Sequence, residues 1–521
     1  MIRETINFVI EKSMNTIQKG TFTVPSVCKQ LCLEYDLKEP YTFLVFMLVK
    51  NPKRAIRFQK QLSYSEPVIC IGQSETDTTI GGIPGEIERG DWTVEIYVFS
   101  EHVERMAQEM KIPFTVKVSD EKRDIREKIG GPVWVDETFY YQNYDMHRRF
   151  QTESRWYKGD FHTHTQLSDG KELPERANEK AKLMNLDYYV ATEHNVLHTG
   201  WPETDVMIMP GVEITTILGH ANLFGIDKRP EKLTDILWHK DEKSLAEDLE
   251  GIIEECKDRD WLFSINHPFL YIWKWLYGGL SLENVNCLEI NNDPTYEADP
   301  DAGAKDANQK AVFLSDLLWA DGYRICAIGG SDSHKEIDDF YPGATEPSIP
   351  GDPATYLYMD GLSPINVLDA LKKCHCYVTR HCQVDSEFYV LDENGKRIQN
   401  VMFGDRLMDE GSVFYFRVQI VLTGFDKAPE IYYIQNGRKT VCAPVKKGEN
   451  IYCAEGEIEL EQSGYQWIRF GADDSNREFM FYGNPITKGS ERHRFHTFGE
   501  IRKYLEEQWQ SEEFYSTKTE Q

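Results

Sequence analysis

Histidines and carboxylates recur through the middle of this chain in short motifs whose side chains could bind metal ions. The motifs are His162-Thr-His164 with Asp169, Glu193-His194, Glu213, His220, His267 and Asp332-Ser-His334. Imidazole nitrogens and carboxylate oxygens are the ligands of Zn, Mn and Fe sites in proteins. Taken together, the motifs predict a pocket that holds two or three divalent metal ions, which is typical of a hydrolase.

The spacing of the first motif favours a shared cation. His162 and His164 directly follow the strand-like segment WYKGDF. Residues i and i+2 of an extended strand point to the same face, so both rings can reach one ion. Asp169 lies close by in a Ser-Asp-Gly turn, although it could instead cap a helix that begins near Leu173.

Each of the other motif residues has an ordinary structural explanation when it is taken alone. Glu213 could be a solvated acid at a strand end, and His220 could be a core histidine. His267 could mark a turn, and Asp332 could form a structural hydrogen-bonded pair with His334. The predicted metal site therefore depends on all of these side chains meeting in one place.

Helices alternate with short apolar strands between Trp156 and Arg380. The pattern predicts helices over residues 172–185, 242–260, 308–322 and 363–374, and strands over 187–192, 261–265, 323–328 and 375–380. Such alternation implies an α/β fold with a parallel sheet or barrel. Active sites in these folds lie at the carboxyl ends of the strands, and in three of the four units the candidate ligands follow the strand.

The flanks of this region are rich in strand patterns. Residues 21–99 predict a small β-sandwich, preceded by an N-terminal helix with Ile6, Val9 and Ile10 on one face. Residues 101–154 are charged and resemble a connector, and the chain after residue 383 is again β-rich, with an Asn436-Gly437 hairpin turn. We expect four parts: residues 1–154, the metal-binding part 155–382, a β-rich part 383–490, and a helix with a polar tail over 491–521.

Composition narrows the choice of partners and compartment. A formal net charge of −28 without a long basic cluster argues against nucleic acid as a partner. No apolar run reaches the length of a membrane span, and the start is a poor secretory signal. The odd number of cysteines, 11, favours reduced thiols in a cytoplasmic protein, and Cys374-His375-Cys376 is predicted to be structural. The oligomeric state cannot be read from the sequence.

Six motifs, in this order, resemble those of the polymerase-and-histidinol-phosphatase (PHP) superfamily. They are DFHTHTQLSDG, TEHN, PGVEI, GHANLFG, INHPF and GGSDSH, and the β-rich flanks resemble the carbaryl-hydrolase-like branch of these metallohydrolases. The resemblance implies a distorted (β/α)7 barrel, flanked by N-terminal and C-terminal β-rich domains, with two or three metal ions at the strand ends. The ligands that it implies are His162, His164, Asp169, His194, Glu213, His220, His267, Asp332 and His334. Glu193 departs from the usual TDHN; it either orients a neighbour or binds metal directly.

The function implied by this resemblance is hydrolysis of a small phosphate ester by a metal-bridging hydroxide. We expect His194, Glu213 and His267 to be catalytic, with Glu213 bridging two metals. Three divalent cations beside three ligand acids would leave a charge of about +3, which suits an anionic substrate. The same ligands would also serve a carbamate or carboxylic ester hydrolase, and a third possibility is a binding protein with a residual metal site. The loops 269–280 and 336–353 could shape the pocket or simply pack on the β-sandwich.

Overall fold

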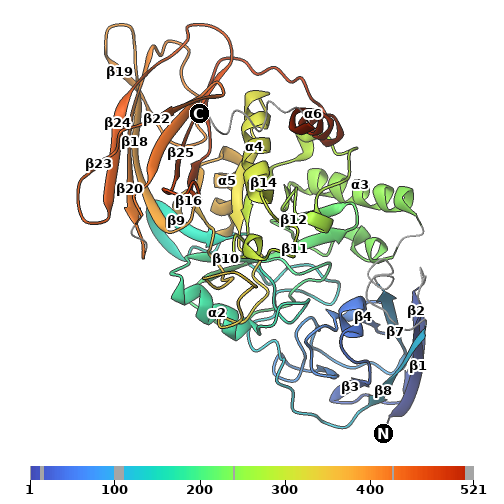
Figure 1. Ribbon diagram of the computed structural model, residues 1–521. Coiled ribbons are helices and arrows are strands. Elements are labelled where there is room, and N and C mark those ends of the chain that lie inside the picture. Colours follow the sequence, from blue (N-terminus) through green and yellow to red (C-terminus); the bar gives the residue numbers. More distant parts are fainter. Residues whose placement is uncertain (1, 12–16, 99–110, 239–240, 425–426, 511–521) are drawn as a thin grey trace.

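Two antiparallel four-stranded sheets form the N-terminal part of the protein, at the lower right of Figure 1. The computed structural model describes residues 2–11, 17–98, 111–238, 241–424 and 427–510. One sheet has the order β1 (Arg3–Glu11), β8 (Lys111–Ser119), β3 (Gln30–Tyr35) and β6 (Val68–Gly72). The other has the order β2 (Gln18–Val24), β7 (Gly90–Val98), β4 (Val45–Lys50) and β5 (Ile56–Gln61). Apolar side chains from both sheets, among them Phe8 and Trp92, share one hydrophobic core.

The predicted N-terminal helix is wrong, because this segment is the strand β1. Phe8 and Ile10 are buried two residues apart, which is the period of a strand. The backbone of β1 pairs with β8 along its whole length, from Arg3 opposite Ser119 onward. This pairing outweighs the helical spacing of a few apolar residues. β8 itself falls within the predicted connector, so part of that connector belongs to the N-terminal sheets.

The central sheet has the order β15, β14, β13, β12, β11, β10, β9, β16 and β17. These strands are β9 (Gln151–Asp160), β10 (Tyr188–Ala191), β11 (Met207–Thr216), β12 (Gly219–Phe224), β13 (Leu262–Ile265), β14 (Cys287–Asn292), β15 (Cys326–Gly330), β16 (Ala354–Leu362) and β17 (Cys376–Thr379). Strands β9 to β11 are parallel to one another, as are β13 to β15, whereas β12 and β16 are antiparallel to their neighbours. The sequence pattern predicted a parallel sheet or barrel, whereas the observed sheet is mixed.

The four predicted helices of this region are confirmed. They are α2 (Pro174–Leu183), α3 (Glu242–Arg259), α4 (Ala307–Ala320) and α5 (Pro364–Lys373). Helix α3 begins where the Asp241 side chain accepts a hydrogen bond from the Ser244 N–H, and it ends at Asp260 in the left-handed conformation. Its stripe of apolar side chains, including Leu245 and Leu249, is buried. Short 3₁₀ helices are η1 (Tyr41–Leu44), η2 (Glu231–Leu233), η3 (Asp235–Leu237), η4 (Tyr271–Trp273), η5 (Leu282–Asn284) and η6 (Tyr296–Ala298).

The central sheet continues into the C-terminal part, on the opposite side of the molecule from the N-terminal sheets (Figure 1). Strand β17 pairs with β26 (Phe479–Gly483), and the sheet runs on through β25 (Gln466–Asp473), β21 (Glu430–Gln435) and β22 (Arg438–Val441), with β27 (Ile486–Lys488) beside β25. A second sheet contains β19 (Arg397–Val401), β18 (Cys382–Leu391), β20 (Val413–Leu422), β24 (Ile451–Glu459) and β23 (Val445–Lys446). The predicted Asn436-Gly437 hairpin and the final helix, α6 (Phe498–Gln510), are confirmed. The division at residue 382 stays a prediction, and the β17–β26 pairing runs across it.

Side chains join the two ends of the central run of strands. Among the described residues, β15 and β17 share no backbone ladder, so the strand pairings alone do not close into a ring. The fully buried Asn484 bridges them: its Oδ1 accepts from the Ala327 N–H at 2.8 Å, and its Nδ2 donates to the carbonyl oxygens of Ala327 at 2.9 Å and Cys376 at 3.1 Å. The Thr355 hydroxyl also bonds both backbone groups of Gly329, at 2.9 Å each.

We expect Asn484→Ala to destabilise the protein by about 2–4 kcal/mol, because buried backbone groups of β15 and β17 would lose their partner. Urea unfolding followed by circular dichroism measures the change in the free energy of unfolding. The matched control is Asn476→Ala, at an exposed turn, which should change it by less than about 0.5 kcal/mol. Equal stability of the two variants would show that this bridge does not hold the strands together.

The cysteines depart in part from the prediction of reduced thiols. Cys32 and Cys70, on the paired strands β3 and β6, are joined in a disulfide. The other nine cysteines are free. Cys374 and Cys376 are buried at the end of α5 and the start of β17, in agreement with a structural role. In the part of the chain that the structure describes, no helix is long and apolar enough to cross a membrane.

Candidate metal centre

The nine predicted ligands lie together at one edge of the central sheet. Five of them follow a strand: His162 and His164 follow β9, His194 follows β10, His267 follows β13, and Asp332 follows β15, with His334 two residues further on. Glu213 lies within β11, His220 lies near the start of the antiparallel strand β12, and Asp169 lies in the loop after His164. Backbone hydrogen bonds hold the loops side by side, because Asp332 N–H donates to the His162 carbonyl at 2.8 Å. The predicted convergence is confirmed as geometry.

Glu213 lies at the centre of the cluster and is fully buried. Its Oε1 is 3.2 Å from His162 Nε2 and 3.1 Å from His220 Nδ1. Its Oε2 is 2.6 Å from His194 Nδ1, and His267 Nε2 lies 3.5 Å from Oε1. A carboxylate whose two oxygens face different imidazoles is placed to bridge two cations, which is the position predicted for Glu213.

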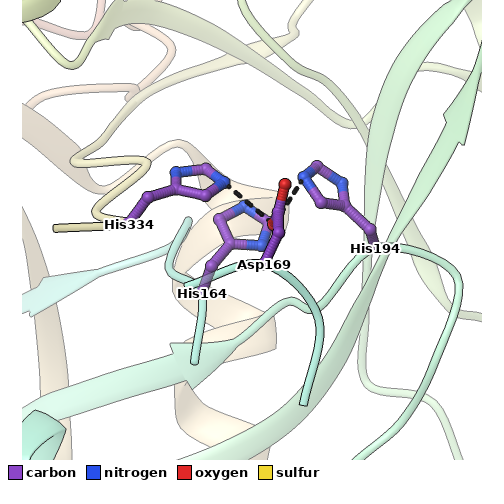
Figure 2. Close-up of side chains that lie close together, drawn as sticks. All are labelled: His164, Asp169, His194 and His334. Carbon is purple, nitrogen blue, oxygen red and sulfur yellow. Dashed lines mark ion pairs between the residues drawn. The ribbon is translucent and has the colours of Figure 1, made fainter. Parts of the chain in front are cut away.

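Asp169 forms a second focus with three histidine rings, as Figure 2 shows. Its Oδ1 is 3.3 Å from His194 Nε2 and 3.3 Å from His334 Nε2. The His164 ring stacks between them, with its centroid 4.3 Å from that of His194 and 4.1 Å from that of His334. The sequence left open that Asp169 only caps α2. This alternative is wrong, because the N-cap position of α2 is Leu173, four residues after Asp169, and no side chain caps the helix there.

Asp332 connects the two foci. Its Oδ1 is 3.0 Å from His164 Nε2 and 3.2 Å from His162 Nε2. The residue adopts a left-handed backbone conformation, with φ 49°, which aspartate tolerates better than most residues. The strand β15 thus ends in a sharp turn that directs this carboxylate at both histidines of the first motif.

The hydrogen bonding of the buried ligand atoms tests whether these residues fit metal ions. The buried atoms His162 Nε2, His164 Nε2, Asp169 Oδ1 and Asp332 Oδ1 make no well-oriented hydrogen bond among the described residues, although each lies 3.0–3.3 Å from an ion-pair partner within the cluster. Buried polar atoms are usually well hydrogen-bonded, so these imperfect contacts among crowded imidazoles and carboxylates favour cations held between them. Four sets of these side chains bring their ligand atoms within 4.8 Å of one another: His164 with Asp169, His194 and His334; His162 with Glu213 and His267; His162 with His164 and Asp332; and His194 with Glu213 and His220. The donor set fits two or more divalent ions.

The electrostatics of the cluster keep its acids ionised. Burial favours the neutral form of Glu213, but the neighbouring His162, His194 and His220 hold the pKa of this carboxyl well below its usual range. The pKa values of the histidines differ from one residue to another. Burial, with the neighbouring His334 and His194, lowers the pKa of His164 to about 4, and burial lowers the pKa of His220 to about 4. These two rings are therefore neutral at pH 7, which is the form that binds metal.

Glu289 is a functional residue that the sequence analysis missed. It lies in β14, and its Oε1 is 2.9 Å from His162 Nδ1, while its Oε2 accepts from the His267 N–H at 2.9 Å. A carboxylate behind a ligand histidine fixes the ring and its tautomer. Gly330 makes the approach possible, since a Cβ built there would lie 2.1 Å from Glu289 Oε1. Two features of the sequence could have pointed to Glu289: the strand-like segment CLEIN that contains it, and the paired glycines before Ser331.

We expect Glu289→Gln to weaken metal binding by roughly 10–100-fold, because His162 would lose its carboxylate partner while the ligand atoms remain. Titration of the metal-free protein with Zn²⁺ or Mn²⁺ measures this affinity. Glu283→Gln, on the 3₁₀ helix η5 at the other end of β14, is the matched control and should bind as the wild type does. An unchanged affinity in Glu289→Gln would mean that Glu289 does not orient the ligand.

The structure decides the role of Glu193, which the sequence left open between direct metal binding and orientation. Its fully buried carboxylate accepts from the Thr165 N–H at 3.0 Å, from the Ser168 hydroxyl at 2.5 Å, and interacts with His198 Nε2 at 2.8 Å. Although burial alone would raise it, the pKa of Glu193 falls to about 2 because of His198 and these hydrogen bonds. Glu193 therefore shapes the loop between His164 and Asp169, and it belongs to none of the four ligand sets.

A cavity of about 330 Å³ opens over the metal-ligand cluster. Six of the nine candidate ligands line it: Asp169, His194, His220, His267, Asp332 and His334. The N-terminal part of the protein contributes Phe43, Leu44 and Gln61 to the lining. The loop 269–280 contributes Leu270 and Trp273, and the loop 336–353 contributes Tyr341. The remaining lining residues are Thr215, Asn292, Asp293 and Tyr296. Parts of both loops therefore shape the pocket. Trp275, also in the loop 269–280, does not line it: this side chain is buried and packs against Phe263 and Phe498.

Asp293 is a second residue of interest that no motif in the sequence indicated. Its buried carboxylate accepts hydrogen bonds from the hydroxyls of Thr295 at 2.5 Å and Ser348 at 2.8 Å. Burial raises the pKa of Asp293 to about 7. The cavity wall therefore carries a group that can hold a proton near neutral pH, next to the ligand cluster.

Comparison with known proteins adds little to this geometry. No protein-family model matches the chain, and no curated protein matches it. Among solved structures, the chain is similar to a crystal structure of a two-domain protein containing a predicted PHP-like metal-dependent phosphoesterase from Bacteroides vulgatus ATCC 8482. The two are 14% identical, the match covers 68% of this chain and 98% of that chain, and the TM-score is 0.33. A similarity this weak does not establish a shared fold or function.

Proposed function

We propose that this protein is a metal-dependent hydrolase, and more specifically a phosphoesterase that acts on a small phosphate ester. The observation that carries the proposal is the convergence of nine candidate ligand side chains beside a cavity, where four buried ligand atoms lack a well-oriented hydrogen bond. Structural metal sites are closed off by their ligands, whereas this cluster faces an open cavity, as a catalytic site must. The binding-protein alternative gains no support from this arrangement.

We further propose that the central strands form the distorted barrel that the PHP resemblance implies. The bridges made by Asn484 and Thr355 between β15 and its neighbours β16 and β17 support it, because they bring the two ends of the strand run together. The ligand-bearing strand ends then form one rim.

The ligand side chains have distinct roles in this proposal. Divalent ions, when bound, supply an activated water and stabilise the charge that develops on the ester oxygens. Glu213 would hold two of these ions at a fixed separation, and His267 and His194 would fix the remaining positions around it. Glu289 and Glu193 keep the first motif rigid, so that the ligand atoms need little rearrangement when the substrate arrives.

The charge of the site favours an anionic ester. With three divalent cations, the ligand acids Asp169, Glu213 and Asp332 and one hydroxide would leave a charge of about +2, which attracts phosphate; with two cations the excess would be at most about +1. Among the described residues that line the cavity, none is lysine or arginine. The cations themselves would therefore be the only positive groups for the phosphate in this wall.

The apolar side of the cavity favours a second candidate function. Phe43, Leu44, Leu270 and Trp273 offer an uncharged surface that would suit a neutral carbamate or carboxylic ester as well as the organic part of a phosphate ester. The metal ligands would assist attack at a carbonyl carbon in a similar way, so the geometry of the ligands does not separate the two reactions.

A substrate panel separates these functions. Purified protein is first analysed for bound metal and is then assayed, loaded with Zn²⁺, Mn²⁺ or Fe²⁺, against p-nitrophenyl phosphate, bis-p-nitrophenyl phosphate, p-nitrophenyl acetate and an aryl N-methylcarbamate. We expect the highest kcat/KM on the phosphate monoester. Faster turnover of the carbamate or acetate would favour the second candidate, and bound metal without turnover of any ester would favour a binding protein.

A further inference from the structure

The N-terminal sheets form one wall of the cavity and are attached to a loop that carries a metal ligand. The 3₁₀ helix η1 contributes Phe43 and Leu44, and β5 ends at Gln61, which lines the same cavity. Gln61 N–H donates to the carbonyl of Leu167 at 3.1 Å, within the loop between His164 and Asp169. The hydroxyl of Ser63 donates to the carbonyl of Ser168 in the same loop. The wall is thus held in register with the metal centre.

The side chain of Gln61 is oriented and yet incomplete in its hydrogen bonding. It is 5% exposed, and its Nε2 donates to the Phe43 carbonyl at 2.9 Å, which fixes the orientation of the amide. Its Oε1 is buried and has no partner among the described residues. Buried amide oxygens are nearly always paired, so this atom indicates a partner that the protein chain itself does not supply.

Asn292, which also lines the cavity, repeats the same arrangement. Its Nδ2 donates to Glu289 Oε2 at 3.0 Å and to Asp332 Oδ2 at 3.3 Å, which again fixes the amide. Its Oδ1 is buried and unpartnered in the described structure. Two fixed amides that line the cavity therefore each retain an unused acceptor oxygen.

These oxygens define the chemistry of the group that would meet them. A carbonyl oxygen can only accept, so its partner must carry an O–H or N–H. Phe43 lies beside Gln61, and the lining of the same cavity also includes the aromatic side chains of Trp273, Tyr296 and Tyr341. A ring-bearing group with one hydrogen-bond donor fits such a wall, whereas a second anionic group would meet no lysine or arginine among the described lining residues.

We propose that Gln61 is a specificity-determining residue: its Oε1 accepts a hydrogen bond from an O–H or N–H on the leaving group, and Phe43 packs against the apolar part of that group. The substrate class is then an ester of an alcohol that bears a ring and a hydrogen-bond donor. The identity of the ester bond rests on the proposed function, but recognition of the leaving group does not.

Matched esters test the proposal in kinetics. The substrates are phosphate monoesters of 4-hydroxyphenyl alkanols with two-, three- and four-carbon linkers, each compared with its methyl ether. The scissile oxygen is the same in each pair, so the intrinsic reactivity is matched while the donor is removed. We expect the metal-loaded wild type to prefer the hydroxyl ester by about tenfold or more in kcat/KM for at least one linker, because a site built for a donor rejects an analogue that lacks it.

Variants of Gln61 assign that preference. In Gln61→Met the ratio of the two kcat/KM values should fall to about one, whereas Gln61→Glu, which keeps an acceptor oxygen, should retain a preference for the hydroxyl ester. The matched control is Gln399→Met, where the wild-type amide likewise donates to a backbone carbonyl, at 2.9 Å, but lies in the C-terminal sheet. An equal preference in the wild type and Gln61→Met would overturn the proposal, as would a wild type that shows no preference with any linker.

A binding measurement separates failure of this proposal from failure of the proposed phosphoesterase. The free 4-hydroxyphenyl alkanols and their methyl ethers are titrated into the wild type and Gln61→Met, followed by ligand-observed NMR. If no phosphate ester is turned over, the phosphoesterase proposal fails, and binding alone decides the role of Gln61. At least about fivefold tighter binding of the hydroxyl compound, in the wild type only, would support the proposal, and equal binding would overturn it.

Discussion

Replacement of both His162 and His164 by alanine is expected to abolish metal binding and to lower turnover by roughly 10³-fold or more. These rings face Glu213 and Asp332 at 3.0–3.6 Å and belong to three of the four ligand sets, so their loss removes ligands from both foci of the cluster. Metal analysis of the purified variant and its kcat/KM on the best ester of the panel measure the effect.

A matched double variant distinguishes loss of ligands from a general loss of histidines. His147 is exposed, and His375 pairs with Asp405 near the C-terminal part, so His147→Ala with His375→Ala should retain metal and turnover. Circular dichroism should show that the β-rich parts remain folded in both double variants. Unchanged turnover in the His162 and His164 variant would refute the assignment of the metal centre.

Removal of metal from the wild type is expected to abolish turnover and to lower thermal stability together. A ligand that binds only the folded state stabilises it by about 2.7 kcal/mol when its concentration is 100 times Kd. Chelation would also leave His162 Nε2 and Asp332 Oδ1 buried 3.2 Å apart, without a well-oriented hydrogen bond in place of the cation. Differential scanning calorimetry and the ester assay, run before chelation, after it, and after metal is returned, measure both effects at constant pH.

The same double variant of His162 and His164 serves as the control for this second prediction. It should melt at one temperature whether or not metal is added, since its ligand set is incomplete. If chelated wild-type protein, verified to be free of metal, kept both its activity and its melting temperature, neither catalysis nor stability would depend on metal ions.

Much of the site could be predicted because strand ends and ligand motifs coincide in the sequence. His194, His267 and Asp332 each follow a short apolar strand, and parallel strands bring their carboxyl ends to one edge. Glu289 and Asp293 could not be predicted in the same way. Glu289 is one acid in an apolar strand without a histidine neighbour, and the raised pKa of Asp293 arises from burial, which only the folded chain creates.

The errors in the predicted fold have the same origin: the sequence pattern does not show contacts between distant segments. β1 was expected as a helix because its apolar spacing allows both structures, and the choice is made by β8, more than 100 residues away. β12 is antiparallel because it follows β11 through a two-residue turn at Ile217 and Leu218 that leaves no room for a crossover helix. Gln61 and Phe43 gave no signal, since they reach the cavity only through docking of the N-terminal sheets.

The hydrogen-bonded passage from β17 to β26 has a consequence for how the protein can be divided. A protein that ends at residue 382 would lack β26, the strand that pairs with β17. The unpaired edge of β17 would then be exposed to solvent and would promote aggregation. Shortened versions made for crystallisation should therefore keep the segment through residue 488, however modular the sequence looks. Heating should likewise unfold the central and C-terminal parts in a single cooperative step, because the same ladder of backbone hydrogen bonds joins them.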